Sequence, residues 1–134
     1  MSLNALEHLL VLTDDLEATR AFYRDVLGLD DGVRPPLPFP GHWLYAGSVP
    51  CVHIADRTAY RAHSRALGLE PYEDSCGTGV IDHIAFRASD YDAIVQRLER
   101  CGVPAVSNTV EGAGIRQFFV RDPNGVTVEI NVLP

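Results

Sequence analysis

The feature that most constrains the fold of this 134-residue chain is an internal repeat, with an offset of about 75 residues between its two halves. Leu6-Glu7-His8-Leu9 aligns with Ile81-Asp82-His83-Ile84. Towards the other end of each half, Val52-His53-Ile54 aligns with Val128-Glu129-Ile130. A repeat of this kind marks a supersecondary unit that packs against its copy. The chain is therefore expected to fold as two similar modules.

Each half shows the pattern of a strand, a helix and then two or three strands, which predicts an α+β fold. The pattern in the first half predicts a helix from Leu16 to Leu27 and strands at 6–13, 43–46 and 51–55. The pattern in the second half predicts a helix at 91–100 and strands at 82–87, 103–106, 117–120 and 127–132. We expect one domain over residues 1–134, with module 1 at about 1–56, a connector at about 57–79 that contains a short helix at 60–67, and module 2 at about 80–134.

Charge and composition exclude several classes of protein. The 18 acidic residues outnumber the 11 basic ones, and the net charge of −7 argues against nucleic acid as a partner. Every basic residue is Arg, so no lysine is present to form a Schiff base. The longest near-apolar run, Leu9 to Leu12, is too short to span a membrane, and we expect neither a membrane span nor a secretion signal. Three cysteines without CxxC spacing favour a cytoplasmic protein with buried thiols.

The repeat places chemically matched residues at equivalent positions. His8 and His83 fall on the first strand of each half, and His53 and Glu129 fall on the last strand. A single strand histidine is more often structural than a ligand, but two repeat-related pairs are seldom produced by chance. An ionised Glu129 within an apolar strand also needs a cation or hydrogen bonds to offset the cost of burying its charge. If the halves form one curved sheet, these four side chains converge as a divalent metal site requires.

Several longer motifs resemble the vicinal oxygen chelate superfamily, which includes glyoxalase I, extradiol dioxygenases and bleomycin resistance proteins. These motifs are Glu7-His8, Phe22 to Leu29 (FYRDVLGL), Asp82 to Phe86 (DHIAF), Phe118 to Gly125 (FFVRDPNG) and Val128-Glu129-Ile130. The resemblance covers nearly the whole chain. It implies two βαβββ modules that form a curved mixed sheet around a metal-binding cleft, with His8, His83 and Glu129 on the metal-ligand strands.

The resemblance leaves three functions open. Glyoxalase I-like lyase or isomerase chemistry would act on a small substrate with adjacent oxygens through an enediolate, with Glu129 and His53 as the catalytic pair. If the metal is Fe(II) and His53 is not a ligand, extradiol-type ring cleavage is the alternative. A metal-free protein that binds a small molecule, such as a drug, is the third. His53 stands where glyoxalase I usually has Glu, so its role as ligand or base stays open, as does the choice among Ni, Zn, Co, Mn and Fe(II).

The remaining expectations concern the substrate and the assembly. Arg34 and Arg116 are candidates to bind an anionic group of the substrate, and Trp43, Tyr45 and Gln117 lie on strands expected to line the cleft. Small chains of this kind leave sheet edges uncovered, so a homodimer is expected. The connector is long enough for the modules to pair within one chain or across a swapped dimer.

Overall fold

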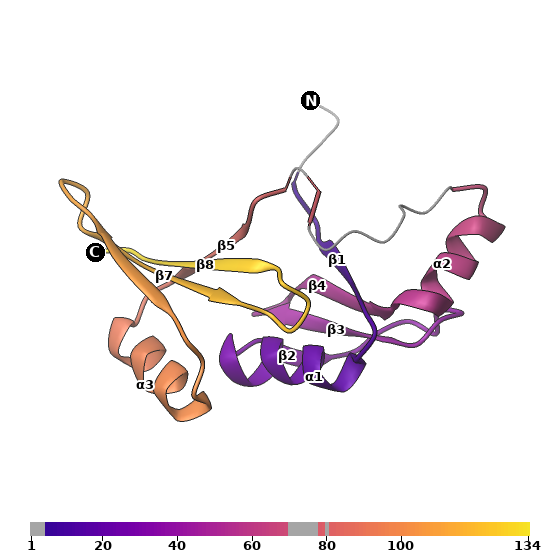
Figure 1. The fold of residues 1–134 in the computed structure, drawn as a ribbon, viewed down its shortest axis with the longest axis horizontal. Coiled ribbons are helices and arrows are strands. Elements are labelled where there is room, and N and C mark those ends of the chain that lie inside the picture. Colours follow the sequence, from indigo (N-terminus) through magenta and orange to yellow (C-terminus); the bar gives the residue numbers. More distant parts are fainter. Residues whose placement is uncertain (1–4, 70–77, 80) are drawn as a thin grey trace. The chain divides into compact units, whose positions relative to one another are not determined.

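A computed structural model describes residues 5–69, 78–79 and 81–134 of the chain. The chain divides into two compact units, Met1–Glu73 and Asp74–Pro134, and each contains one of the two modules (Figure 1). Each module has its own four-stranded mixed sheet. The expected α+β fold of two βαβββ modules is therefore confirmed.

Module 1 contains β1 (Leu9–Thr13), β2 (Asp30–Gly32), β3 (Gly41–Ala46) and β4 (Val49–Asp56), arranged in the order β1-β4-β3-β2. Strand β1 runs parallel to β4, whereas the other two pairings are antiparallel. Between β1 and β2 the chain forms α1 (Leu16–Ala21), which continues directly as the π-helical segment η1 (Phe22–Val26). The predicted helix from Leu16 to Leu27 is thus present, but its second half is wound more loosely than an α-helix.

Module 2 repeats this plan with β5 (Ile84–Ala88), α3 (Tyr91–Cys101), β6 (Val106–Val110), β7 (Ile115–Arg121) and β8 (Thr127–Val132). The strand order is β5-β8-β7-β6, with β5 parallel to β8 and the remaining pairs antiparallel. The two sheets therefore have the same topology, as the repeat predicts.

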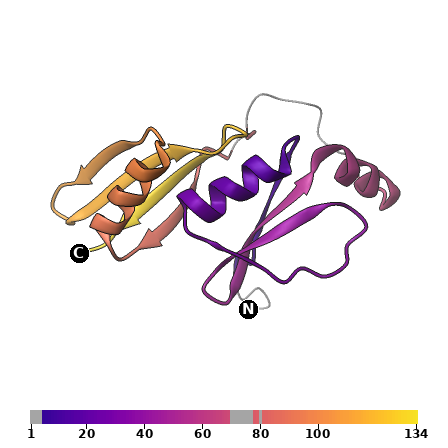
Figure 2. The same ribbon diagram turned by 90° about the horizontal axis from the view of Figure 1, so that it is seen from below.

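One helix lies across one face of each sheet, α1 in module 1 and α3 in module 2 (Figure 2). The helix-covered faces hold the apolar core of each module, which includes Leu44, Val52 and Ile54 in module 1 and Phe118, Val120, Val128, Ile130 and Val132 in module 2. We call the opposite face the distal face. Because side chains alternate along a strand, it carries Leu10, Trp43 and His53 in module 1, and Ala85, Gln117 and Glu129 in module 2.

The expected strand at 103–106 is wrong, because β6 begins only at Val106. Gly102 adopts a left-handed conformation with φ of 63°, and the Val103 amide donates to the carbonyl of Leu98 at 3.1 Å. Val103 therefore completes the C-terminal cap of α3. Strand β6 has no buried residue, so it lacks the apolar alternation by which a strand is recognised.

Two smaller expectations also need correction. Cys101, expected to be buried, is exposed at the end of α3, whereas Cys51 is half-buried and Cys76 lies outside the described residues. The connector helix is α2 (Arg57–Ala66), which begins three residues before the expected 60–67. It begins there because Asp56 accepts a hydrogen bond from the Ala59 amide at 2.8 Å and caps the helix.

No helix in the described part of the chain is both long and apolar enough to cross a membrane.

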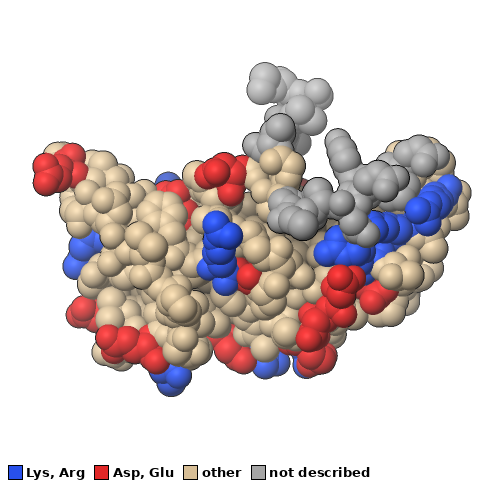
Figure 3. Space-filling view, in the orientation of Figure 1, with Lys and Arg blue, Asp and Glu red and all other residues tan. Residues whose placement is uncertain are grey.

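An ion pair and an aromatic contact hold the connector helix against module 1. Basic side chains gather over α2 and lie beside acidic ones (Figure 3). The Arg57 Nε donates to Asp14 Oδ1 at 3.1 Å, and the Phe39 ring packs edge-on against Tyr60 with centroids 5.1 Å apart. These contacts tie both the start of α2 and the proline-rich loop before β3 to the first unit.

Asp122 organises the turn between β7 and β8, and its replacement by alanine is expected to destabilise the protein. The buried carboxylate accepts hydrogen bonds from the amides of Asn124 and Val126, both at 2.8 Å. Asp122→Ala leaves these amides without their acceptor, so the free energy of unfolding should fall by about 2 kcal/mol in urea denaturation. Glu111→Ala, at an exposed turn position, is the control and should change it by less than about 0.5 kcal/mol. Equal losses in both variants would contradict the assigned role of Asp122.

Candidate metal half-sites on the distal faces

Three rings form a stack on the distal face of module 1. The His53 ring lies between Trp43 and His8, with centroid distances of 4.0 Å and 3.8 Å and interplanar angles of 10° and 13°. The His53 Nε2 lies 3.0 Å from the Pro50 carbonyl, which can only accept a hydrogen bond. Nε2 therefore carries the proton in the neutral ring, and Nδ1 keeps the lone pair. Burial, together with the nearby His8, lowers the pKa of His53 below its ordinary value, which favours this neutral form.

An acidic side chain orients a histidine at the start of each module. The Nδ1 of His8 lies 2.9 Å from Glu7 Oε1, and the Nδ1 of His83 lies 2.7 Å from Asp82 Oδ2. Because the carboxylates are acceptors, both Nδ1 atoms donate, and each histidine has its Nε2 as the remaining potential ligand atom. In this structure the Nε2 of His83 lies 2.9 Å from Glu129 Oε2. Metal-binding histidines usually donate their second ring N–H to a carboxylate or carbonyl in this way. Both halves of the repeat therefore contain the histidine together with the acidic residue that precedes and orients it. We call each acid and histidine an orienting pair.

Glu129 is buried on the distal face of module 2 and is held at both oxygens. Oε2 lies 2.9 Å from the Nε2 of His83, and Oε1 accepts a hydrogen bond of 2.8 Å from Gln117 Nε2. The same nitrogen of Gln117 donates to Asn131 Oδ1 at 3.0 Å, while Asn108 Nδ2 donates to Gln117 Oε1 at 2.8 Å. These bonds supply the compensation that the buried carboxylate requires.

The structure thus brings the predicted ligands together in two pairs, His8 with His53 and His83 with Glu129. Across residues 5–69, 78–79 and 81–134, no group of three or more His, Cys, Asp or Glu side chains forms a metal cluster. We call each pair a half-site, because its donors are of kinds that divalent transition metals accept: two imidazole nitrogens in module 1, and one imidazole nitrogen and one carboxylate in module 2. The donor types are those of a divalent metal site, but the stacked His8 and His53 rings do not direct both lone pairs at one point in this arrangement. The four-ligand set stays a prediction.

The predicted substrate-binding residues differ in their surroundings. In module 1, Trp43 belongs to the ring stack, Tyr45 donates its hydroxyl to the Val33 carbonyl, and Arg34 Nη2 donates to the Phe39 carbonyl at 2.6 Å. In module 2, Gln117 lies on the distal face, but Arg116 lies on the helix-covered face with its Cζ 3.7 Å from the centre of the Tyr91 ring. Arg116 and Glu129 are therefore on opposite faces of one sheet.

Sequence reasoning missed Asn131 and Arg87. Asn131 lies two residues after Glu129 and Arg87 lies four residues after His83, so alternation along a strand places both on the same face as these two ligands. The two strands also pair Arg87 with Asn131 directly. Counting in steps of two from each candidate ligand would have identified them.

The titration of His83 provides a test of the orienting pair. The hydrogen bond to Asp82, and then the negative charge of Glu129, raise the pKa of His83 above its ordinary value. Because the folded value is raised, protonation of His83 stabilises the fold below the unfolded pKa, and this gain is lost as pH rises through the folded pKa. We expect Asp82→Asn to lower the His83 pKa in an NMR titration of EDTA-treated protein. Asp92→Asn, on α3, is the control, and an unchanged titration in Asp82→Asn would contradict the role of Asp82.

Comparison with known proteins identifies the family of the chain. The model of the Glyoxalase/Bleomycin resistance protein/Dioxygenase superfamily matches residues 5–130. The match spans both modules and includes all four candidate ligands. The chain therefore belongs to this superfamily.

Individual relatives point to more than one activity within the superfamily. The chain is 28% identical to "Glyoxylase I 4" of Arabidopsis thaliana, covering 97% of this chain and 71% of that protein. It is 29% identical to "Glutathione transferase FosA" of Serratia marcescens, covering 97% and 82%. A lactoylglutathione lyase structure from Agrobacterium tumefaciens superposes with a TM-score of 0.66 at 23% identity, covering 98% of this chain and 96% of that one. At this identity the last comparison shows the shared fold alone.

Proposed function

We propose that the chain is a divalent-metal-dependent enzyme that acts as a glyoxalase I-like lyase or isomerase on a small substrate with adjacent oxygens. The observation that carries the proposal is the matched orientation of two histidines: Glu7 and Asp82 accept hydrogen bonds from the Nδ1 atoms of His8 and His83, and the Nε2 of His83 faces Glu129 Oε2 at 2.9 Å. The proposed ligands are His8, His53, His83 and Glu129. Membership of the superfamily, in which a glyoxalase I relative is found, supports the same chemistry.

In the proposed reaction one proton moves between two adjacent carbons of the substrate, with an enediolate as the intermediate. A bound divalent cation supplies Lewis-acid stabilisation of the negative charge on the two oxygens. Glu129 Oε2 takes the proton from the first carbon and returns it to its neighbour, so no proton is gained or lost overall. His53 Nδ1 is the other basic atom, and it has this role only if it is not a ligand, because a coordinated nitrogen has no free lone pair.

Elemental analysis of the purified protein and of His53→Ala tests the proposal. We expect near-stoichiometric metal in the wild-type chain, recovery of binding when EDTA-treated protein is given Ni, Co, Zn, Mn or Fe(II), and weaker binding in His53→Ala. Isomerisation of a hemithioacetal is then the first assay. Fe(II) retained despite the substitution would favour catechol ring cleavage instead. If the chain binds no metal under any of these conditions, the proposal of a metal-dependent enzyme is wrong. The remaining interpretation is then a protein that binds a small molecule without catalysis.

Gln117 is expected to support metal binding by holding Glu129 in place. Its amide is fully used, because both hydrogens are donated and Oε1 accepts from Asn108. We propose that it positions the carboxylate and expect Gln117→Ala to weaken Co²⁺ binding by about 10–100-fold in calorimetric titrations, as loss of an outer-shell partner does. Gln96→Ala, at an exposed position of α3, should leave the affinity unchanged. If Gln117→Ala binds Co²⁺ as tightly as the wild-type chain, Gln117 does not support metal binding.

We further propose that the protein is a cytoplasmic homodimer. Strands β2 and β6 each pair with only one neighbour in their sheets and contain no buried residue. Uncovered strand edges of this kind favour association with a second chain. Light scattering coupled to size-exclusion chromatography gives the mass directly, and a monomer at micromolar concentration would overturn the proposal.

A further inference from the structure

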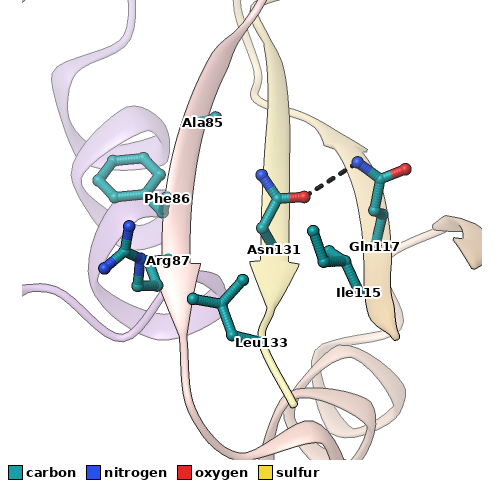
Figure 4. Close-up of a pocket in the computed structure, with 7 residues that line it drawn as sticks. All are labelled: Ala85, Phe86, Arg87, Ile115, Gln117, Asn131 and Leu133. Carbon is teal, nitrogen blue, oxygen red and sulfur yellow. Dashed lines mark hydrogen bonds between the residues drawn. The ribbon is translucent and has the colours of Figure 1, made fainter. Parts of the chain in front are cut away.

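A pocket on the distal face of module 2 lies beside the residues proposed as metal ligands and contains none of them (Figure 4). Its volume is about 330 Å³. Ala85, Ile115 and Leu133 provide apolar lining, whereas the polar side chains are Arg87, Gln117 and Asn131. Gln117 also donates to Glu129, so the pocket adjoins the second half-site.

A chain of hydrogen bonds fixes the orientation of the Asn131 amide. Asn108 donates to Gln117 Oε1, so the Gln117 nitrogen must face Asn131, whose Oδ1 accepts from it. The Asn131 nitrogen is consequently on the side away from Gln117, as Figure 4 shows. Within the described residues this nitrogen donates to no acceptor. Two N–H groups of Asn131 are therefore available to a ligand in the pocket.

Arg87 places a positive charge beside these donors. It is the direct strand partner of Asn131 and forms no ion pair or hydrogen bond with any residue that the structure describes. Arg87 lines the pocket, and its guanidinium lies along the outer side of β5 in Figure 4. Arg116, in contrast, is stacked on Tyr91 on the other face of the same sheet.

We propose that this pocket binds an oxyanion group, such as a carboxylate or a phosphonate, that is carried on a small apolar skeleton. Arg87 and the Asn131 amide donate hydrogen bonds to the anion, since a guanidinium and an amide have complementary donors for its oxygens. Ile115 and Leu133 contact the carbon skeleton. The inference rests on the proposed function, because it assigns the substrate class by placing an anionic end next to the group that takes the proton.

Calorimetric titration of the full-length, EDTA-treated chain tests this site without interference from a metal. The probes are 3-phenylpropionate, 2-phenylethylphosphonate and the neutral 3-phenylpropionamide. We expect at least one anion to bind at least about tenfold more tightly than the amide, because hydrogen bonds to a charged group are the stronger ones. The comparison of the two anions shows whether carboxylate or phosphonate is preferred.

Variants separate the pocket from the rest of the surface. Arg87→Gln and Asn131→Asp should each weaken binding of the preferred anion by about tenfold or more, whereas Arg116→Gln should not. Arg87 is exposed, so its variant is suitable even if Asn131→Asp fails to fold. If the anions and the amide bind equally well, the pocket is not an oxyanion site. The same conclusion follows if Arg87→Gln and Arg116→Gln weaken anion binding equally. Failure of the proposed function is seen separately, as a lack of metal in the elemental analysis.

Discussion

Glu129→Gln is expected to abolish enzymatic turnover and to weaken metal binding by more than about 100-fold, which exceeds the usual loss for an outer-shell partner. The substitution preserves the shape of the side chain and an oxygen that can accept from Gln117, whose bond to Glu129 is 2.8 Å. It removes the negative charge and the basic oxygen that faces His83 at 2.9 Å. One substitution therefore removes both proposed roles of Glu129, as a metal ligand and as the proton acceptor.

The control for this variant is Glu111→Gln in the exposed turn between β6 and β7. It makes the same change in net charge within the same module and should retain both metal and activity. Metal content is measured by mass spectrometry and affinity by titration with Co²⁺. Wild-type affinity in Glu129→Gln would exclude Glu129 as a ligand, and wild-type turnover would exclude it as the base.

Gly41→Ala is expected to lower the free energy of unfolding by about 3 kcal/mol, the upper part of the range for overpacking. A Cβ atom at this position would lie 2.3 Å from the Ile54 carbonyl oxygen. Gly41 pairs with Ala55 at the start of β3, so the contact is with the backbone of the neighbouring strand. Neither strand can move away without disturbing the sheet that holds His53 and Trp43.

Gly32→Ala is the matched control, because its new Cβ would meet only the side chain of Tyr45, at 2.6 Å. A ring can rotate away, whereas a backbone carbonyl within a sheet cannot. Chemical denaturation should therefore show a clearly smaller loss for Gly32→Ala. Equal stability of Gly41→Ala and the wild-type chain would contradict the close approach of β3 and β4.

The topology of both modules could be predicted from the sequence because their central strands have a clear apolar pattern. In β8, buried Val128, Ile130 and Val132 recur at every second position and indicate a strand with one face towards the core. The edge strand β6 has no such residues, since all five of its positions are exposed. Its position depends on the cap that ends α3 and on pairing with β7, which are not visible as local periodicity.

The candidate ligands could be chosen from the repeat, but the hydrogen bonds between them and residues on neighbouring strands could not be predicted. Arg116 and Gln117 are adjacent in the sequence and lie on opposite faces of the sheet, so only the register shows which one shares a face with Glu129. The bonds of Gln117 to Glu129 and Asn131 likewise depend on cross-strand pairing. The local sequence identifies side chains suited to bind a metal, but it does not show which side chains on other strands will lie next to them.

The two modules share a topology but differ in the hardness of the donors they provide. Module 1 offers two imidazole nitrogens, whereas module 2 offers one imidazole and one carboxylate. Nitrogen-rich sites suit zinc, copper and nickel, while oxygen-rich sites suit manganese and magnesium. The proposed four-ligand set is therefore intermediate in donor type, and we expect a single exchange at position 53 or 129 to shift its metal preference along this series.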